Sequence, residues 1–211
     1  MQIPVRSASA LTLTVLLALG AAGCDPSRPG AAAVVGGTRI SAASISRQVS
    51  DLEAESPGAT GSDAVQKTLE YAVQRVLFEQ VAARQHPAVT VSQGDLDALR
   101  AQAVAQLGGE QQLQQTLLQQ DVPRSGTDDY LRLVVLSQKV GAVLVPGGAE
   151  VADQRDAAIS KALQEQAVRS GIHVSPRFGR WDPRSGIVPL ASGGLATPAA
   201  GSGAGTGSSA G

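Results

Sequence analysis

The sequence predicts a mainly α-helical fold with one small sheet. Between residues 31 and 175, apolar residues recur at intervals of three and four along most of the chain, which is the period of a helix buried on one face. Residues that favour helix starts precede these segments, and glycine or proline follows them. Two short apolar runs, residues 31–35 and 172–174, are instead typical of strands, and we expect them to pair.

The first expected elements are a strand at residues 31–35 and a helix that follows it closely. The two glycines after Val35 supply the turn that ends the strand. Ser41 or Ser44 can cap the helix, because a hydroxyl accepts hydrogen bonds from the free N–H groups of a first turn. The helix is expected to run through Glu55. Its apolar face consists of Ile45, Val49 and Leu52.

A longer helix is expected after a loop at residues 57–62. Asp63 is predicted to cap it, and its helical spacing extends over residues 64–85. The His86-Pro87 pair ends it, since the residue before a proline avoids the helical conformation. The apolar positions at helical spacing are Val65, Leu69, Val73, Val76 and Leu77.

Three further helices are expected before the middle break of the chain. Ser92 is the predicted N-cap of a helix that stops at Gly108. A short helix follows over residues 110–120. Thr127 then opens a helix that ends at Leu144, and its last fourteen residues are apolar almost all round, so we expect it to be buried against several neighbours.

The last expected helix covers residues 149–170, after a break at residues 146–148. Gly171 closes it, just before the second candidate strand. Its inward positions are predicted to be Val151, Ile159, Leu163 and Ala167. Pairing of residues 31–35 with residues 172–174 would bring this helix back onto the first part of the domain.

The N-terminus carries the parts of a bacterial lipoprotein export signal. Arg6 precedes an apolar stretch from Ala8 to Leu19, which is too short to span a bilayer and fits the apolar region of a signal peptide. Small residues then lead to Cys24, the only cysteine. We predict that Cys24 is lipidated with a diacylglyceryl group and becomes the first residue of the mature chain. The alternative is a free or core cysteine after an ordinary signal peptide.

A lipid on Cys24 would place the mature chain on the extracytoplasmic face of the cell membrane, since two or more acyl chains anchor a protein stably. No disulfide is expected, because Cys24 has no partner. Removal of the signal leaves 16 basic and 18 acidic side chains, a balance that lacks the positive charge of a nucleic-acid-binding protein. The covalent lipid is the only non-protein group expected, and no cofactor is predicted.

No catalytic or metal-binding constellation is predicted. His86 and His173 are the only histidines, and neither has a second ligand at metal spacing; His86 is expected to face solvent. The Asp128-Asp129 pair lies at a helix start, where negative charge interacts favourably with the helix dipole. The same interpretation applies to Asp95 and Asp97. With Cys24 lipidated no thiol nucleophile remains, so neither an enzyme nor a small-molecule substrate is expected.

Aromatic residues are scarce, which argues against an aromatic-rich cradle for peptides. They are Tyr71, Phe78, Tyr130, Phe178 and Trp181. Trp181 lies beside Arg180 and close to Arg177, where it either covers the core or contacts a partner. We favour the core interpretation.

Several segments follow one another in a familiar order. Residues 33–41 run from a strand through a turn directly into a helix, and residues 89–97 (VTVSQGDLD) lead into another. Residues 108–118 and 122–144 supply a short helix and a closing helix, and residues 172–182 follow the last one. This order resembles the SurA-like and PrsA-like foldases, whose N-terminal module opens on "V-N-G-x-x-I-S". The resemblance covers about residues 31–182.

The resemblance implies a chaperone module on which a long C-terminal helix packs back. It does not carry over prolyl isomerase activity, because residues 145–148 join the two parts directly and leave no room for the parvulin domain of the full foldases. The function it implies is a lipid-anchored holdase that binds unfolded exported polypeptides without catalysis, through a partly exposed apolar groove. Two alternatives stay open: a dedicated envelope adaptor that binds one specific protein, and a peptidyl-prolyl isomerase relative.

These interpretations divide the chain into five parts. They are a lipoprotein signal peptide (1–23), a tether (24–30), the SurA-N-like helical module (31–145), the C-terminal helix with a closing segment (146–191), and a disordered Gly/Ala/Ser tail (192–211).

Overall fold

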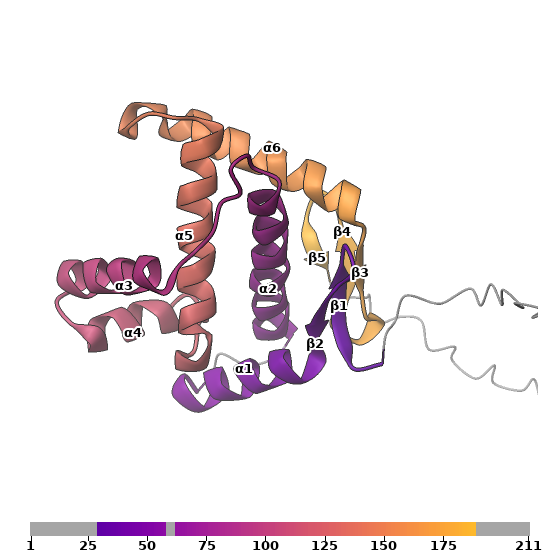
Figure 1. Cartoon of the computed structure of the whole chain (residues 1–211). Helices are drawn as coiled ribbons and strands as arrows, with labels where there is room; N and C mark the ends of the chain where they lie inside the picture. The colour runs from indigo at the N-terminus through magenta and orange to yellow at the C-terminus, as the bar shows by residue number, and fades with distance from the viewer. Residues whose placement is uncertain (1–28, 58–61, 189–211) are drawn as a thin grey trace, which may run out of the picture.

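The computed structural model describes residues 29–57 and 62–188 (Figure 1). The predicted signal peptide, the lipidation site Cys24 and the Gly/Ala/Ser tail lie outside these residues. The described part of the chain is mainly helical with small antiparallel sheets, which confirms the predicted fold class. The helices are α1 (Ala42–Glu55), α2 (Ser62–Ala83), α3 (Gln93–Leu107), α4 (Glu110–Leu118), α5 (Thr127–Leu144) and α6 (Ala152–Ser170). The strands are β1 (Ala31–Val35), β2 (Thr38–Ser41), β3 (Ile172–Val174), β4 (Arg180–Asp182) and β5 (Gly186–Val188).

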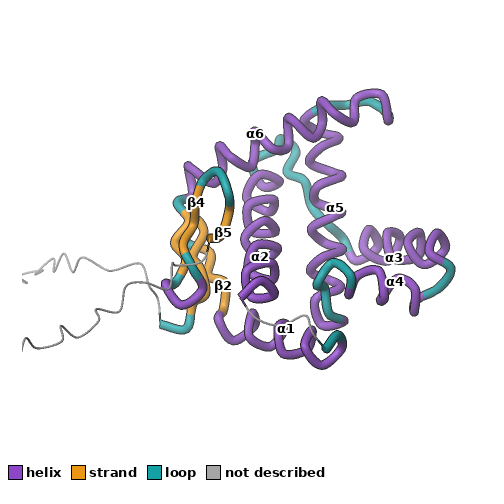
Figure 2. The backbone as a smooth tube through the Cα atoms, turned by 180° about the vertical axis from the view of Figure 1, so that it is seen from behind, coloured by secondary structure: helices purple, strands orange, loops and turns teal. Residues whose placement is uncertain are grey.

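Helix α2 is the centre of the fold. In both views it runs beside α5, while α6 crosses one end of this pair and α1 lies at the other end (Figures 1 and 2). Its side chains Leu69 and Val73 are fully buried in the main core cluster. The α3–α4 pair packs on the far side of α5, away from the sheet (Figure 1). The apolar character of α5 therefore has the predicted cause, which is contact with several neighbours.

The main sheet has the antiparallel order β2-β1-β3. Ala33 pairs with Val174 and Val35 with Ile172, so the predicted pairing of the two distant segments is confirmed. Strand β2 was not predicted as a strand, because only Ile40 of its four residues is buried and no alternating pattern shows. The sheet therefore has three strands rather than two.

A second small sheet, the β4–β5 hairpin, was also not predicted. Each strand has three residues, which is too short for a recognisable period. Its turn is held by Asp182, whose Oδ1 accepts hydrogen bonds from the backbone N–H groups of Arg184 and Ser185 at 2.9 Å. The hydroxyl of Ser185 donates to the same oxygen. Together these bonds hold the pKa of Asp182 at about 2, and the bond from the Ser185 hydroxyl is the largest cause. The aromatic ring of Trp181 packs half-buried against the main core, as predicted.

Most helix boundaries agree with the prediction to within two residues, and the Asp63 assignment was wrong. Helix α2 begins at Ser62, so Asp63 lies in its first turn, where its charge still suits the helix dipole. Ser41 occupies the cap position of α1, yet its side chain makes no capping bond. Ser92 does cap α3, in a reciprocal capping box with Asp95. The predicted last helix is divided into a 3-10 turn, η2 (Ala149–Val151), and α6.

Helix α6 is fastened to the rest of the fold by a buried polar network. Gln80 of α2 donates from Nε2 to the carbonyl of Val35 at 3.0 Å, while its Oε1 accepts from Gln166 at 2.8 Å and Ser170 at 2.5 Å. Gln166 is buried, although it interrupts the apolar face. Gly36 permits this approach, because a Cβ there would lie 2.9 Å from Nε2 of Gln80.

None of the described helices is by itself long and apolar enough to cross a membrane. Among the described residues, one pair of adjacent segments, 124–144 and 149–170, has the length and composition of a membrane span when the two are taken together. The two segments are bent by 87° at the break between them.

Candidate functional site

The candidate site is a cavity of about 260 Å³ between the sheet and the helices. It is bordered by β2, the start of α1, the middle of α2, the loop at residues 121–126 and the first half of α5. All four residues of β2 line it, although successive side chains of a strand point to opposite faces. The cavity therefore follows the edge of β2 rather than one face of the sheet.

The edge of β2 beside the cavity is open. In the order β2-β1-β3, β2 is an outer strand, and no other described strand pairs with it. Such an edge presents backbone N–H and C=O groups that can pair with an added strand. The cavity and the edge together form a surface that suits an extended chain.

The floor of the cavity is apolar. It is formed by Ile45 of α1, Val76 of α2 and Leu133 of α5, all buried. Ile45 and Val76 belong to the apolar faces that the sequence pattern predicts for their helices. Leu133 packs in a second buried cluster of the core. The floor is therefore fixed by the same packing that holds the three helices together.

The two tyrosines of the chain form one wall. The rings of Tyr71 and Tyr130 meet edge to face, with centroids 5.6 Å apart and an interplanar angle of 81°. Both hydroxyls donate to Gln120, from Tyr71 to the backbone carbonyl at 3.2 Å and from Tyr130 to Oε1 at 2.5 Å. Burial raises the pKa of Tyr71. The pair thus holds the loop after α4 against α2 and α5.

Charged residues on the rim are paired with one another, apart from Arg39, which donates to the carbonyl of Pro29. Arg75 contacts Glu79 at 2.9 Å from Nη1 and Asp129 at 3.7 Å from Nε. Lys67 donates to Asp121, and this hydrogen bond raises the pKa of Lys67. These pairs leave the rim close to electrically neutral, so it offers no concentrated charge for a strongly charged ligand.

Thr68 supplies an unsatisfied polar group in the wall. Its side chain is 4% exposed, and its Oγ1 has no hydrogen-bond partner among the described residues. A buried hydroxyl without a partner costs roughly 1–3 kcal/mol. A threonine in a helix often donates to the carbonyl four residues earlier, and Thr116 does so to Gln112 at 2.9 Å. Thr68 does not, so its buried hydroxyl stays without a partner among the described residues.

The lining contains no histidine or cysteine that could act as a base or a nucleophile. Within residues 29–57 and 62–188, no group of three or more His, Cys, Asp or Glu side chains could hold a metal ion. His86 is exposed after α2, as predicted, and His173 is exposed on β3. What the arrangement offers is apolar contact, ring surface and hydrogen bonds.

The acidic residues noted in the sequence have structural partners. Asp128 pairs with Arg100 at 3.1 Å, and Asp129 belongs to the cavity rim. Asp97 accepts from Gln93 at 2.9 Å. Both Asp128 and Asp129 lie in the first turn of α5, as predicted.

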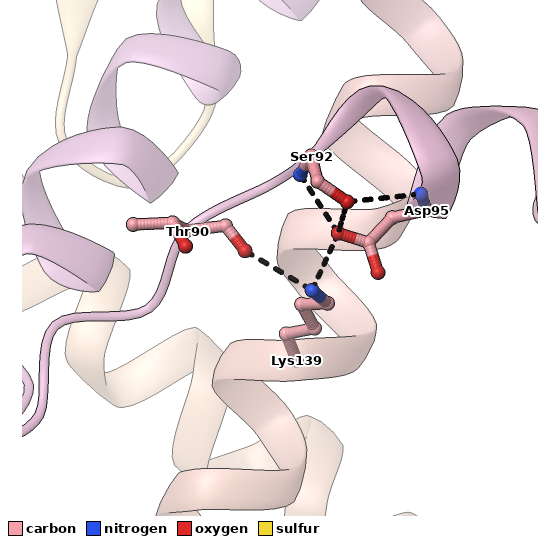
Figure 3. Close-up of polar contacts among 4 residues, drawn as sticks. All are labelled: Thr90, Ser92, Asp95 and Lys139. Atoms are coloured by element: carbon pink, nitrogen blue, oxygen red, sulfur yellow. Dashed lines mark hydrogen bonds and ion pairs between the residues drawn. The ribbon is translucent and has the colours of Figure 1, made fainter.

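Asp95 is the centre of a polar cluster that joins α3 to α5 (Figure 3). Its Oδ2 accepts from Lys139 at 2.6 Å, and from the backbone N–H and the hydroxyl of Ser92 at 2.7 and 2.8 Å. Lys139 also donates to the carbonyl of Thr90 at 3.1 Å. The Lys139 bond is the largest cause that holds the pKa of Asp95 at about 2. The cluster fixes the chain segment between α2 and α3, and it does not line the cavity.

Comparisons with protein-family models, with curated proteins and with solved structures find no match for this chain. The resemblance of residues 31–182 to SurA-like modules therefore stays a prediction. The account of the site rests on its own geometry.

Sequence reasoning did not find this cavity. The sequence shows only that aromatic residues are scarce. The structure shows that both tyrosines, Tyr71 and Tyr130, line the cavity. The cavity mixes polar and apolar walls, whereas the resemblance to foldases predicts an apolar groove. In the described part of the chain, large apolar side chains are exposed at separate positions on three helices. They are Leu107, Val143 and Val168.

Proposed function

We propose that this protein is a lipid-anchored, extracytoplasmic binding protein of the holdase type, which holds extended segments of exported polypeptides without catalysis. The observation that carries the proposal is the cavity along the open edge of β2. An extended polypeptide can add a strand to such an edge, with backbone hydrogen bonds for affinity and a pocket for an alternate side chain. In this arrangement one apolar side chain of the client enters between Ile45 and Leu133.

Cavity size favours a side chain over a free small molecule. A volume of about 260 Å³ lies below the roughly 300–1,000 Å³ of typical small-molecule sites. The near-neutral rim also suits an uncharged backbone with an apolar side chain.

The N-terminal sequence supports a place of action at the membrane. Lipidation of Cys24 would leave six residues before the first strand at Ala31. Such a short tether keeps the helical domain close to the bilayer, where exported chains emerge. Radiolabelled palmitate incorporation into the wild-type chain, and its loss in Cys24→Ser, tests this part separately.

A second candidate, the dedicated envelope adaptor, is favoured by the fixed polar contacts of the rim. Arg75 is held by two carboxylates and Gln120 by two tyrosines, so the walls are less adaptable than those of a general holdase. An adaptor of this kind would use the same edge and cavity for one defined sequence.

The deciding experiment uses the mature chain, residues 24–211 with Cys24→Ser. At modest molar excess it should suppress light scattering by several unrelated unfolding clients. Suppression of none of them contradicts the holdase. A single stoichiometric partner in crosslinked envelope extracts, without general suppression, would favour the adaptor.

A cavity variant links the activity to the site. Ala72 lines the cavity and is half-buried, so Ala72→Phe should fill the space and reduce suppression several-fold. Ala43→Phe, on the exposed side of α1, is the matched control and should leave it unchanged. Equal suppression by the two variants would place client binding elsewhere.

The isomerase alternative is tested by a rate. With an Xaa-Pro peptide substrate, the mature chain should leave cis–trans isomerisation at its uncatalysed rate, with a time constant of tens of seconds or longer at 25 °C. A rate that rises in proportion to protein concentration would assign the chain an activity that the proposal denies.

A further inference from the structure

Charge is distributed unevenly between the helices and the sheets. The segment from α1 to α6, residues 42–170, contains 11 basic and 16 acidic side chains. The sheet segments, residues 29–41 and 171–188, contain four arginines and one acidic residue, Asp182. A chain that is almost neutral as a whole thus has an acidic helical body and a basic sheet end.

The register of the main sheet places part of this basic charge on its outer face. Arg39 pairs with Val34, and Val34 pairs with His173, so these three residues form one row across the sheet. The neighbouring rows contain the buried residues Ile40 and Val35, which belong to the main core cluster. The row with Arg39 and His173, both exposed, therefore lies on the opposite face.

Two further arginines lie in the segment that follows β3, and one of them adjoins this outer face. Arg180 of β4 lines a cavity of about 310 Å³ together with Val34 and His173. Its side chain is 60% exposed, and its only ion-pair partner among the described residues, Asp182, is 3.8 Å away. Arg177, in the 3-10 turn η3 (Pro176–Phe178) that precedes β4, is exposed and lies 4.7 Å above the ring of Phe178.

The basic face lies where the chain joins its tether. The described chain begins beside the sheet, and the α3–α4 pair lies at the other end of the molecule (Figure 1). Arg39 donates from Nη2 to the carbonyl of Pro29 at 2.9 Å, so it touches the last residues of the tether directly. A lipid on Cys24 would therefore hold this face, rather than the acidic helical end, next to the bilayer.

We propose that the outer face of the sheet, formed by Arg39, His173, Arg177 and Arg180, docks on the anionic phospholipid surface of the bilayer that holds the tether. The proposal rests on the membrane address of the proposed function and adds an orientation to it. Each arginine near an anionic surface raises the binding constant by about a factor of five. The acidic helical body is repelled from the same surface, which sets the orientation further.

The contact is electrostatic and involves no insertion. The rings of Phe178 and Trp181 are half-buried and pack against the main core cluster, so no aromatic side chain is free to enter the acyl region. Binding should therefore weaken as salt screens the arginines, since the screening length falls from about 10 Å at 0.1 M to about 3 Å at 1 M.

The test measures vesicle binding by the mature chain with Cys24→Ser, which has no lipid of its own. It should sediment with vesicles of phosphatidylcholine and phosphatidylglycerol at low salt, and not with phosphatidylcholine alone. Inorganic phosphate should compete no better than chloride at equal ionic strength, because a bilayer and not a phosphate group is the partner. Equal binding to both vesicle types would overturn the proposal.

Matched variants separate this face from charge in general. Arg177→Gln with Arg180→Gln should lower the partition coefficient about 25-fold, whereas Arg47→Gln with Arg84→Gln should not lower it, since Arg47 is exposed on α1 and Arg84 is exposed in the turn after α2. Neither pair lines the client cavity, so suppression of client aggregation should persist in both. Equal loss of vesicle binding in the two double variants would contradict the proposed orientation. Loss of client suppression with vesicle binding intact would contradict the holdase function and leave the docking proposal standing.

Discussion

Thr68 combines burial, an unsatisfied hydroxyl and a position in the cavity wall. Thr68→Val removes that hydroxyl and keeps the shape of the side chain. We expect the free energy of unfolding to rise by about 1 kcal/mol or more, because a buried group without a partner is removed. Chemical denaturation measures it.

Thr116→Val is the control for this substitution, since the hydroxyl of Thr116 already donates to Gln112. It should not stabilise the chain. A fall in the free energy of unfolding for Thr68→Val would show that the hydroxyl has a partner in the folded chain.

Asp95 gives a prediction about acid stability. Its pKa of about 2 in the folded chain lies below its ordinary value of 3.8, chiefly through the bond from Lys139. A lowered pKa means that the ionised form favours the folded state. Its contribution is therefore complete above about pH 5 and is lost as the pH falls from about 4 to 2.

Melting temperatures measured against pH test this prediction. Asp95→Asn should melt below the wild type at pH 6, and the two curves should converge near pH 2. Asp97→Asn removes a formal charge two residues away in the same helix and should not reproduce this pattern. A constant difference between the wild type and Asp95→Asn down to pH 2 would contradict the role given to the Lys139 contact.

At the scale of elements, the docking of α6 depends on Gln80. Gln80→Leu removes the donor to the Val35 carbonyl and the acceptor for Gln166 and Ser170. We expect a loss of about 1–3 kcal/mol in the free energy of unfolding, because buried polar groups on β1 and α6 lose a partner. Gln74→Leu, whose amide reaches only Glu70 in its own helix, should have a much smaller effect. Similar losses in both variants would argue against the network as the fastening of α6.

The elements also show what could be predicted from the sequence. Helices were found because Leu69, Val73 and their neighbours repeat at one spacing within one segment. Strands β2, β4 and β5 were missed because three or four residues are too few to show a period; β3 is as short and was predicted only from its two β-branched residues, Ile172 and Val174. The start of α2 was predicted two residues late, at Ala64 instead of Ser62, since an aspartate is common both as a cap and in the first turn of a helix.

The cavity could not be predicted, because its parts come from distant segments. Thr38, Thr68 and Tyr130 meet only after β2, α2 and α5 have packed. The contacts of Lys139 with Asp95 and of Gln80 with Gln166 have the same origin, since each joins residues far apart in the chain. Local patterns indicate which side chains are buried, and they do not indicate which distant side chains face one another.

At the scale of the whole molecule, the two ends have different proposed roles. In this proposal the sheet end, with its exposed arginines, faces the anionic bilayer. The edge of β2 and the cavity beside it lie between that end and the helical body, where an emerging chain can be added as a strand. The α3–α4 pair lies at the end away from the sheet (Figure 2).

Site-specific photo-crosslinking to an unfolded client tests the central claim most directly. A photoreactive residue at Thr38, exposed on β2 and part of the cavity lining, should crosslink to clients strongly. The same residue at Val168, which is 80% exposed on α6 and is the most exposed large apolar side chain in the described chain, should crosslink weakly. Equal yields at the two positions, or a higher yield at Val168, would mean that clients adhere to exposed apolar surface and that the β2 cavity is not their binding site.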